Sequence, residues 1–378
     1  MNIKRMIILF AAVLLIVIFA PEACASNIDE YYKDPLEASG AAELSEYLSD
    51  ETRGYLAKLG CEEIEFEKIL DVSPKAIFEF IGDLISGKAK GPLKAMLKSM
   101  GAVLLISVCG GFFPDDEKSK SVLNMICGCF VVISVFSPAA ESIKAAAAAI
   151  EACAVFEKAL IPVFAAVVTV SGNPTMALSM QGATFAAAEF VESLAKNFVL
   201  PLVGISGALS VTGAMLPTLR LSAISEILRK TMLTVFASAA GLFTGFLSLK
   251  SLLASSADSL AVKGVKLASS TFVPVIGGAI GEAYTSVVGS LSLLRSTVGI
   301  YAVIAFVVIG IPIIINLALW VLAMRAACAV SDLLDCRVCS EILKSIAFVF
   351  SLVNTLLLLC MAVFIISSGL VVLIKAGE

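Results

Sequence analysis

Residues 298–323, VGIYAVIAFVVIGIPIIINLALWVLA, decide the fold. These 26 residues carry no charged side chain, and about 20 apolar residues suffice for a helix to cross a hydrocarbon core of about 30 Å. Backbone groups in lipid must find their hydrogen-bond partners within the chain, which a helix achieves. The stretch therefore predicts a membrane-spanning helix.

The composition extends this prediction to the whole chain of 378 residues. It is 59% hydrophobic and 15% charged, whereas soluble domains are about 45–50% apolar and about 25% charged. One soluble core cannot hide such an excess. A net charge of −4 gives no basic surface for nucleic acid. Histidine, the commonest general base near neutral pH, is absent. A soluble enzyme, a disordered chain and a nucleic-acid-binding protein are all poor fits.

The fold class we predict is an all-α, polytopic transmembrane helical bundle. Seven further apolar stretches accompany the first, and those near 20 residues can cross a bilayer as helices. They lie at residues 95–113, 121–137, 159–171, 198–216, 231–253, 272–294 and 345–374.

The chain begins with a predicted signal peptide and an acidic head. Residues 1–25 combine a basic start, a short apolar run and a small-residue cleavage site; a retained anchor is the alternative. Residues 26–91 hold 15 acidic and 7 basic side chains, and their helical spacing predicts a small extracytoplasmic helical domain. This domain is either a packing spacer or a docking surface for an extracytoplasmic partner.

The membrane body repeats internally. Ile161-Pro162-Val163 recurs as Val273-Pro274-Val275, and Ser225-Glu226-Ile227-Leu228-Arg229 recurs as Ser340-Glu341-Ile342-Leu343-Lys344. Offsets of about 112–115 residues and a shared order of segments, including basic amphipathic helices at 218–230 and 325–344, predict a duplication. The predicted units are a first span and linker (92–120), repeat 1 (121–230), repeat 2 (231–344), and a final span and tail (345–378).

Proline and glycine interrupt both copies at related places. The first copy breaks at 171–174, and the second carries Gly277 and Gly281 around Glu282. Such paired interruptions favour discontinuous or re-entrant helices, and tightly packed ordinary helices are the alternative. Six or eight spans follow, depending on whether these segments cross the bilayer. With six spans, the basic helices 218–230 and 325–344 both lie on the cytoplasmic side, whereas with eight they no longer share a side.

Polar side chains within apolar segments are candidates for a polar path, since ionisable groups at membrane depth usually face a bundle interior or water. The alternative is a purely structural role, in which Glu189 and Glu192 lie at a helix interface and Asn316 makes an interhelical hydrogen bond. The candidate polar-path and helix-break residues are Glu282, Asn316, Glu189, Pro162, Pro274, Gly277 and Gly281.

No motif predicts catalysis. Cys336-x-x-Cys339 has the spacing of half a zinc site or of a redox pair, but no second pair or histidine lies near it in sequence. This absence favours structural thiols, and Cys127-x-Cys129 is interpreted as helix packing. Walker A, nucleophile-elbow and dinucleotide motifs are also absent. We therefore predict no catalytic, cofactor-binding or metal-binding residues, no cofactor and no enzyme activity.

The signal, the acidic head, the segment Phe272-Val273-Pro274-Val275-Ile276-Gly277-Gly278 and the Ser-Glu-Ile-Leu-Lys helix together resemble the stage III sporulation protein AE family of endospore-forming bacteria. The resemblance implies a multi-pass protein of the mother-cell membrane that surrounds the forespore. It also implies a place in a secretion-like channel complex with ring-forming intermembrane proteins, small membrane subunits and a cytoplasmic secretion-type ATPase.

Three functions remain open at this stage. The first is a non-enzymatic channel-complex subunit needed for spore development, which contacts membrane lipid and no nucleic acid. The second is a self-sufficient permease with a midplane site at the paired interrupted helices. The third is a membrane scaffold with no pore.

Overall fold

The fold is that of a computed structural model, which describes residues 39–61, 64, 74–112, 117–170, 189–215 and 277–373, with isolated positions in 182–186 and 224–245. Every element in these ranges is helical, and none of the described residues forms a strand. The prediction of an all-α protein is confirmed. The predicted signal peptide at 1–25 lies outside the described residues.

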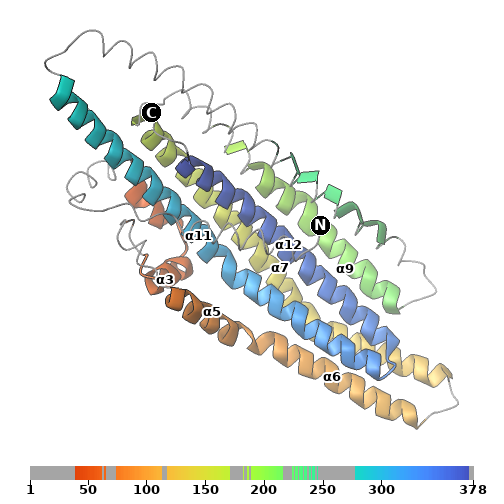
Figure 1. Ribbon diagram of the computed structural model, residues 1–378. Helices are drawn as coiled ribbons and strands as arrows, with labels where there is room; N and C mark the ends of the chain where they lie inside the picture. Colours follow the sequence, from red (N-terminus) through yellow and green to blue (C-terminus); the bar gives the residue numbers. More distant parts are fainter. Residues whose placement is uncertain are drawn as a thin grey trace.

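The elements, in chain order, are η1 (Ala41–Tyr47), α3 (Asp50–Lys58), α5 (Pro74–Lys88), α6 (Lys90–Gly111), α7 (Glu117–Val170), the π-helical turn η2 (Leu194–Val199), α9 (Leu200–Met215), α11 (Gly277–Leu333) and α12 (Arg337–Leu373). The long helices lie side by side along one axis, with α7 packed against both α11 and α12 (Figure 1). Helix α6 also packs on α7 and α11, while α9 covers α12.

Aromatic side chains hold the centre of the bundle together. Phe306 of α11 lies between Phe156 of α7 and Phe364 of α12, with ring centroids 5.2 and 5.5 Å apart respectively. Trp320 of α11 stacks on Phe350 of α12 at 5.3 Å. Such ring pairs stabilise packing beyond their buried area, so α11 and α12 form the centre of the fold.

The short N-terminal helices share this core. In α3, the Ser49 side chain accepts a hydrogen bond from the Thr52 amide at 3.2 Å, capping the helix start. Leu44, Leu56 and Cys61 are buried in the same hydrophobic cluster as the bundle. Only Ala89 separates α5 from α6, so the described part of the predicted head packs directly onto the membrane body.

The structure corrects the predicted interruption of α11. Its backbone is one helix of 57 residues that begins at Gly277, continues through Gly281 and joins residues 277–294, the described part of one predicted span, to the span predicted at 298–323. Each glycine costs a helix only about 1 kcal/mol, a cost that the packing of a long apolar helix easily outweighs. Pro274 lies outside the described residues.

Helix α7 is likewise continuous. It passes through Pro138 and Pro162 and joins the stretches 121–137, 138–158 and most of 159–171. Apolar helices tolerate an internal proline where neighbouring groups satisfy the freed backbone. The predicted break at 171–174 lies outside the described residues.

The helix predicted at 325–344 is divided in two. Helix α11 ends at Leu333 and α12 begins at Arg337. Between them, Asp335 has a left-handed backbone with φ of 52°, and aspartate tolerates this conformation better than most residues. This turn makes α11 and α12 an antiparallel hairpin.

Within the described residues, five helices are long and apolar enough to cross a membrane, which confirms the multi-span membrane class. They cover Lys90–Gly111, Ser121–Val167, Glu189–Met215, Ser296–Leu333 and Arg337–Ile366. Most of 231–253 lies outside the described residues, so the choice between six and eight spans and the internal duplication stay predictions.

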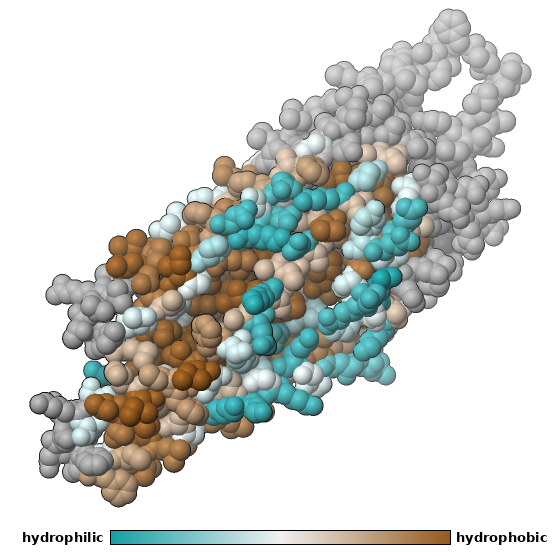
Figure 2. Space-filling model, turned by 180° about the vertical axis from the view of Figure 1, so that it is seen from behind, coloured by the Kyte–Doolittle hydropathy of each residue, from teal (hydrophilic) through white to brown (hydrophobic). Residues whose placement is uncertain are grey.

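The outward face of α7 changes character along its length. Among its described side chains, exposed apolar residues such as Ile133 and Phe136 are followed by the exposed charged residues Glu141 and Lys144. Buried residues including Ala146, Ile150 and Cys153 recur on the inner side, as the predicted amphipathic stretch 138–158 requires. Figure 2 shows hydrophobic side chains gathered towards one end and hydrophilic ones across the middle.

Candidate functional site

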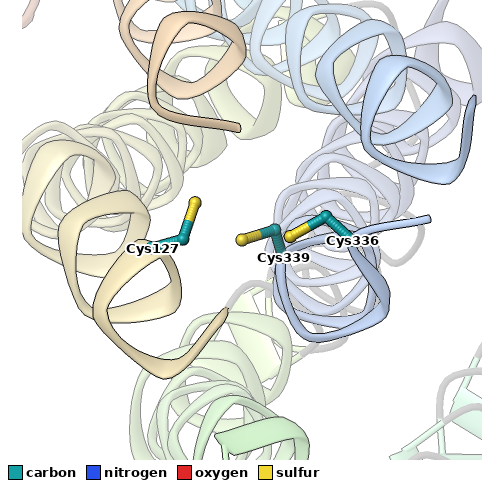
Figure 3. A group of neighbouring side chains, drawn as sticks. All are labelled: Cys127, Cys336 and Cys339. Carbon is teal, nitrogen blue, oxygen red and sulfur yellow. The ribbon is translucent and has the colours of Figure 1, made fainter. Parts of the chain in front are cut away.

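Three buried cysteines from two distant parts of the chain meet at the hairpin end of the bundle. Cys127 lies on α7, Cys336 lies in the turn between α11 and α12, and Cys339 lies in the first turn of α12. Their sulfur atoms all lie within 4.8 Å of one another. Figure 3 shows Cys127 facing the other two across the space between the helices. We call these residues the thiol cluster.

A close helix contact brings the cluster together. Gly128 is the point of contact, since a Cβ there would lie 2.9 Å from Cδ1 of Ile342 and 3.2 Å from Cγ1 of Val338. Only glycine lets α7 approach the start of α12 this closely, which is why the neighbouring Cys127 reaches the turn.

Polar groups surround the thiol cluster. Asn124, one helical turn before Cys127, accepts a hydrogen bond from the Cys336 thiol at its Oδ1, with 3.5 Å between the heavy atoms. The free amides at the start of α12 favour negative charge nearby. Hydrogen bonds from the Cys127 and Cys339 thiols lower the pKa of Cys336 below its ordinary value.

A second polar group fixes the hairpin turn from its outer side. The Ser340 hydroxyl donates to the Asp332 carboxylate, and the Lys344 ammonium lies 3.4 Å from the same carboxylate. The Cys328 thiol approaches Asp332 Oδ2 at 3.7 Å. These contacts join the end of α11 to the start of α12 and hold Cys336 and Cys339 in place.

Sequence reasoning found two of the three thiols and missed the third. Cys336 and Cys339 were recognisable from their spacing, whereas Cys127 precedes them by about 200 residues inside an apolar helix. The one local signal was Asn124, a polar residue one turn away on the same helix face. Tertiary packing, which spacing does not encode, decides that this face meets the turn.

The predicted polar residue Glu189 lies in an ion-pair network between two helices. Lys158 of α7 lies 2.8 Å from Glu189 and 2.9 Å from Glu192. Lys196 lies 2.8 Å from Glu151 of α7 and 3.2 Å from Glu192. These ion pairs place Glu189 and Glu192 at a helix interface, and a role for Glu189 in a polar path stays a prediction.

Asn316 makes the expected interhelical hydrogen bond. Its Nδ2 donates to the Ser142 hydroxyl of α7 at 3.4 Å. Because Ser142 and Lys158 are 16 residues apart on α7, about 24 Å along the helix, Asn316 and Glu189 do not share one site.

The remaining candidates do not add to a described polar path. The backbone is helical on both sides of Pro162 and Gly281. Helix α11 begins at Gly277, and the residues before it lie outside the described part of the chain. The side chain of Glu282 and all of Pro274 lie outside the described residues, and their predicted roles stay predictions.

Comparison with known proteins identifies the family. Residues 69–377 match the family described as stage III sporulation protein AE. The chain is also 25% identical over 310 residues to "Stage III sporulation protein AE" of Bacillus subtilis (strain 168), a match that covers 80% of this chain and 77% of that protein. No solved structure matches the chain.

The chain is therefore a multi-pass helical membrane protein that belongs to the stage III sporulation protein AE family. The family resemblance noted from the sequence is confirmed.

Proposed function

We propose that the protein is a non-enzymatic integral membrane subunit of a secretion-like channel complex that joins mother cell and forespore, and that spore development requires it. Membership of a sporulation protein family carries this proposal. The apolar helices support an integral membrane position. The proposed location is the mother-cell membrane around the forespore, with residues 26–91 on the extracytoplasmic side.

The proposed partners follow from the two kinds of surface outside the core. Helix α5 exposes Phe78, which is 74% accessible, beside the charged Lys75–Glu79 pair. This mixed surface suits a protein partner in the intermembrane space, where we place the ring-forming proteins of the complex. The exposed apolar residues of α6 and early α7, such as Leu105 and Ile133, suit lipid or the small membrane subunits. A cytoplasmic secretion-type ATPase would supply the energy.

Gene deletion tests the requirement for spore development. We expect an in-frame deletion in the native host to yield engulfed forespores that stop developing, and the full chain supplied in trans to restore spores. Normal spore yield in the deletion strain would refute the proposed function.

Cross-linking during sporulation tests the proposed partners. A photoreactive phenylalanine analogue at Phe78 should capture ring-forming extracytoplasmic proteins, identified by mass spectrometry. The matched control is Phe80, two residues away on α5, which is 8% exposed and packs on Tyr55. Capture from neither position, or equally from both, would contradict a docking role for this surface.

A further inference from the structure

We propose that Cys127, Cys336 and Cys339 form a binding site for one thiophilic divalent cation, Zn²⁺, at the hairpin end of the bundle. This inference does not rest on the proposed function, because it follows from the side chains of the thiol cluster alone. It also revises the prediction from sequence, in which no residue was assigned to a metal.

The distances in the cluster fit a zinc site. Zinc–sulfur bonds of about 2.3 Å in a tetrahedron place sulfur atoms about 3.8 Å apart. The three sulfurs lie within 4.8 Å of one another without a cation present. A closure of at most about 1 Å, which small side-chain rotations provide, brings them to bonding positions.

Asn124 provides a fourth ligand in the right place. Its Oδ1 lies 3.5 Å from the Cys336 sulfur. A zinc ion bound to one sulfur and one oxygen at tetrahedral angles separates those atoms by about 3.6 Å. The donor set is then three sulfurs and one oxygen. A Cys-x-x-Cys pair at a helix start is a common zinc-binding spacing, and Cys127 completes the third thiolate.

The surroundings favour the charge of such a site. Zinc displaces the three thiol protons, and the resulting group of one Zn²⁺ and three thiolates carries a net charge of −1. The amino-terminal end of α12 stabilises this charge. The adjoining turn carries charged side chains at the surface, since Asp335 and Arg337 are almost fully exposed.

Zinc binding would tie the outer helix α7 to the α11–α12 hairpin. Without a cation, the cluster connects these elements only through weak thiol hydrogen bonds. Three zinc–sulfur bonds would fix the close approach at Gly128. A structural role at the bundle's end follows, and all four ligand positions are occupied, so no position is left for a substrate.

The direct test is metal binding by the full-length protein, purified reduced in detergent. We expect about one zinc ion per chain by elemental analysis after exposure to Zn²⁺ and desalting, and thiolate-to-metal charge-transfer absorption after loading with Co²⁺. Cys339→Ser should weaken zinc binding at least roughly 100-fold in chelator competition, and Asn124→Ala roughly 10-fold. The matched control Cys129→Ser lies two residues from Cys127 but outside the cluster, so it should bind zinc like the wild type.

Three outcomes would overturn the site. The first is a reduced wild-type chain that takes up no zinc. The second is zinc retained when all three cluster cysteines are serine. The third is a disulfide within the cluster in protein whose thiols were alkylated in intact cells, because that pairing removes two of the ligands. If Cys339→Ser fails to fold, as judged by a loss of helical circular dichroism, the Co²⁺ spectrum of the wild type and the zinc affinity of Asn124→Ala still test whether the cluster binds the metal.

Discussion

The α11–α12 hairpin and helix α6 both meet the length and composition of membrane spans, yet they use their apolar side chains differently. The hairpin buries aromatic residues such as Phe306, Trp320 and Phe364 against its neighbours. Helix α6 buries only a narrow stripe, Pro92, Ala95, Ser99 and Val103, and leaves large apolar side chains exposed. Hydrophobicity therefore places a segment in the membrane class, while the pattern of small and aromatic residues decides which helices form the core.

Replacing the central aromatic residue of the hairpin should cause the largest loss of stability. Phe306→Ala removes the ring between Phe156 and Phe364, and we expect a loss of about 3–5 kcal/mol in the free energy of unfolding. Phe136→Ala on the outer face of α7, where the side chain is 71% exposed, should cost about 0.5 kcal/mol or less. Unfolding in mixed micelles of increasing SDS content, followed by circular dichroism, measures both. Equal losses would mean that the hairpin is not the core.

A smaller effect is expected where α11 touches α12 most closely. A Cβ at Gly310 would overlap the sulfur of Met361, so Gly310→Ala should cost about 1–3 kcal/mol in the same assay. In a protein that already carries Met361→Ala, Gly310→Ala should cost less than it does in the wild type, since the atoms that a Cβ at Gly310 would overlap are gone.

Gly101 provides the matched control on α6. A Cβ there meets no atom within 4 Å, and Gly101→Ala should stabilise the helix by about 0.5–1 kcal/mol. A destabilised Gly101→Ala, or a neutral Gly310→Ala, would contradict the difference in packing between the two regions.

The smallest effect concerns the ion pairs at the periphery. Lys158→Met leaves Glu189 and Glu192 without their shared cation, and we expect a loss of about 1 kcal/mol that shrinks as salt is added. Lys230→Met removes an exposed pair with Glu226 within one helix and should change stability by less than about 0.5 kcal/mol. The same unfolding assay measures both variants at low salt. Equal losses of stability for Lys158→Met and Lys230→Met would show that an ion pair between two helices contributes no more stability here than one between residues four apart.

The sequence was most informative where composition and periodicity acted over many residues. The membrane class, the all-helical fold and the amphipathic face of 138–158 each follow from the hydrophobicity of many residues taken together, and each agrees with the structure of the described residues. Asn316 makes the interhelical hydrogen bond that was weighed as the alternative to a polar path, because a lone amide in an apolar helix has few other ways to satisfy its hydrogen bonds. Its place in a polar path stays a prediction.

Local signals were less reliable. Gly281 and Pro162 favoured broken helices, but the long helices continue through them, because packing outweighs propensities of about 1–3 kcal/mol. The repeated motif makes the same point. Ile227 in its first copy is 64% exposed, whereas the equivalent Ile342 is fully buried in the contact with Gly128. Identical residues take different environments when their neighbours differ, which is also why Cys127 was not recognised as a partner of the Cys-x-x-Cys pair.

The length of α11 has a mechanical consequence. At 57 residues it measures about 85 Å, nearly three times the thickness of a hydrocarbon core. An upright rod of that size cannot be confined to lipid, so much of it must stand in water or against other proteins. If such a rod pivots by about 10° within the bilayer, an end about 50 Å away moves by about 9 Å. On that geometry, a small rotation within the membrane becomes a larger displacement well beyond the lipid headgroups.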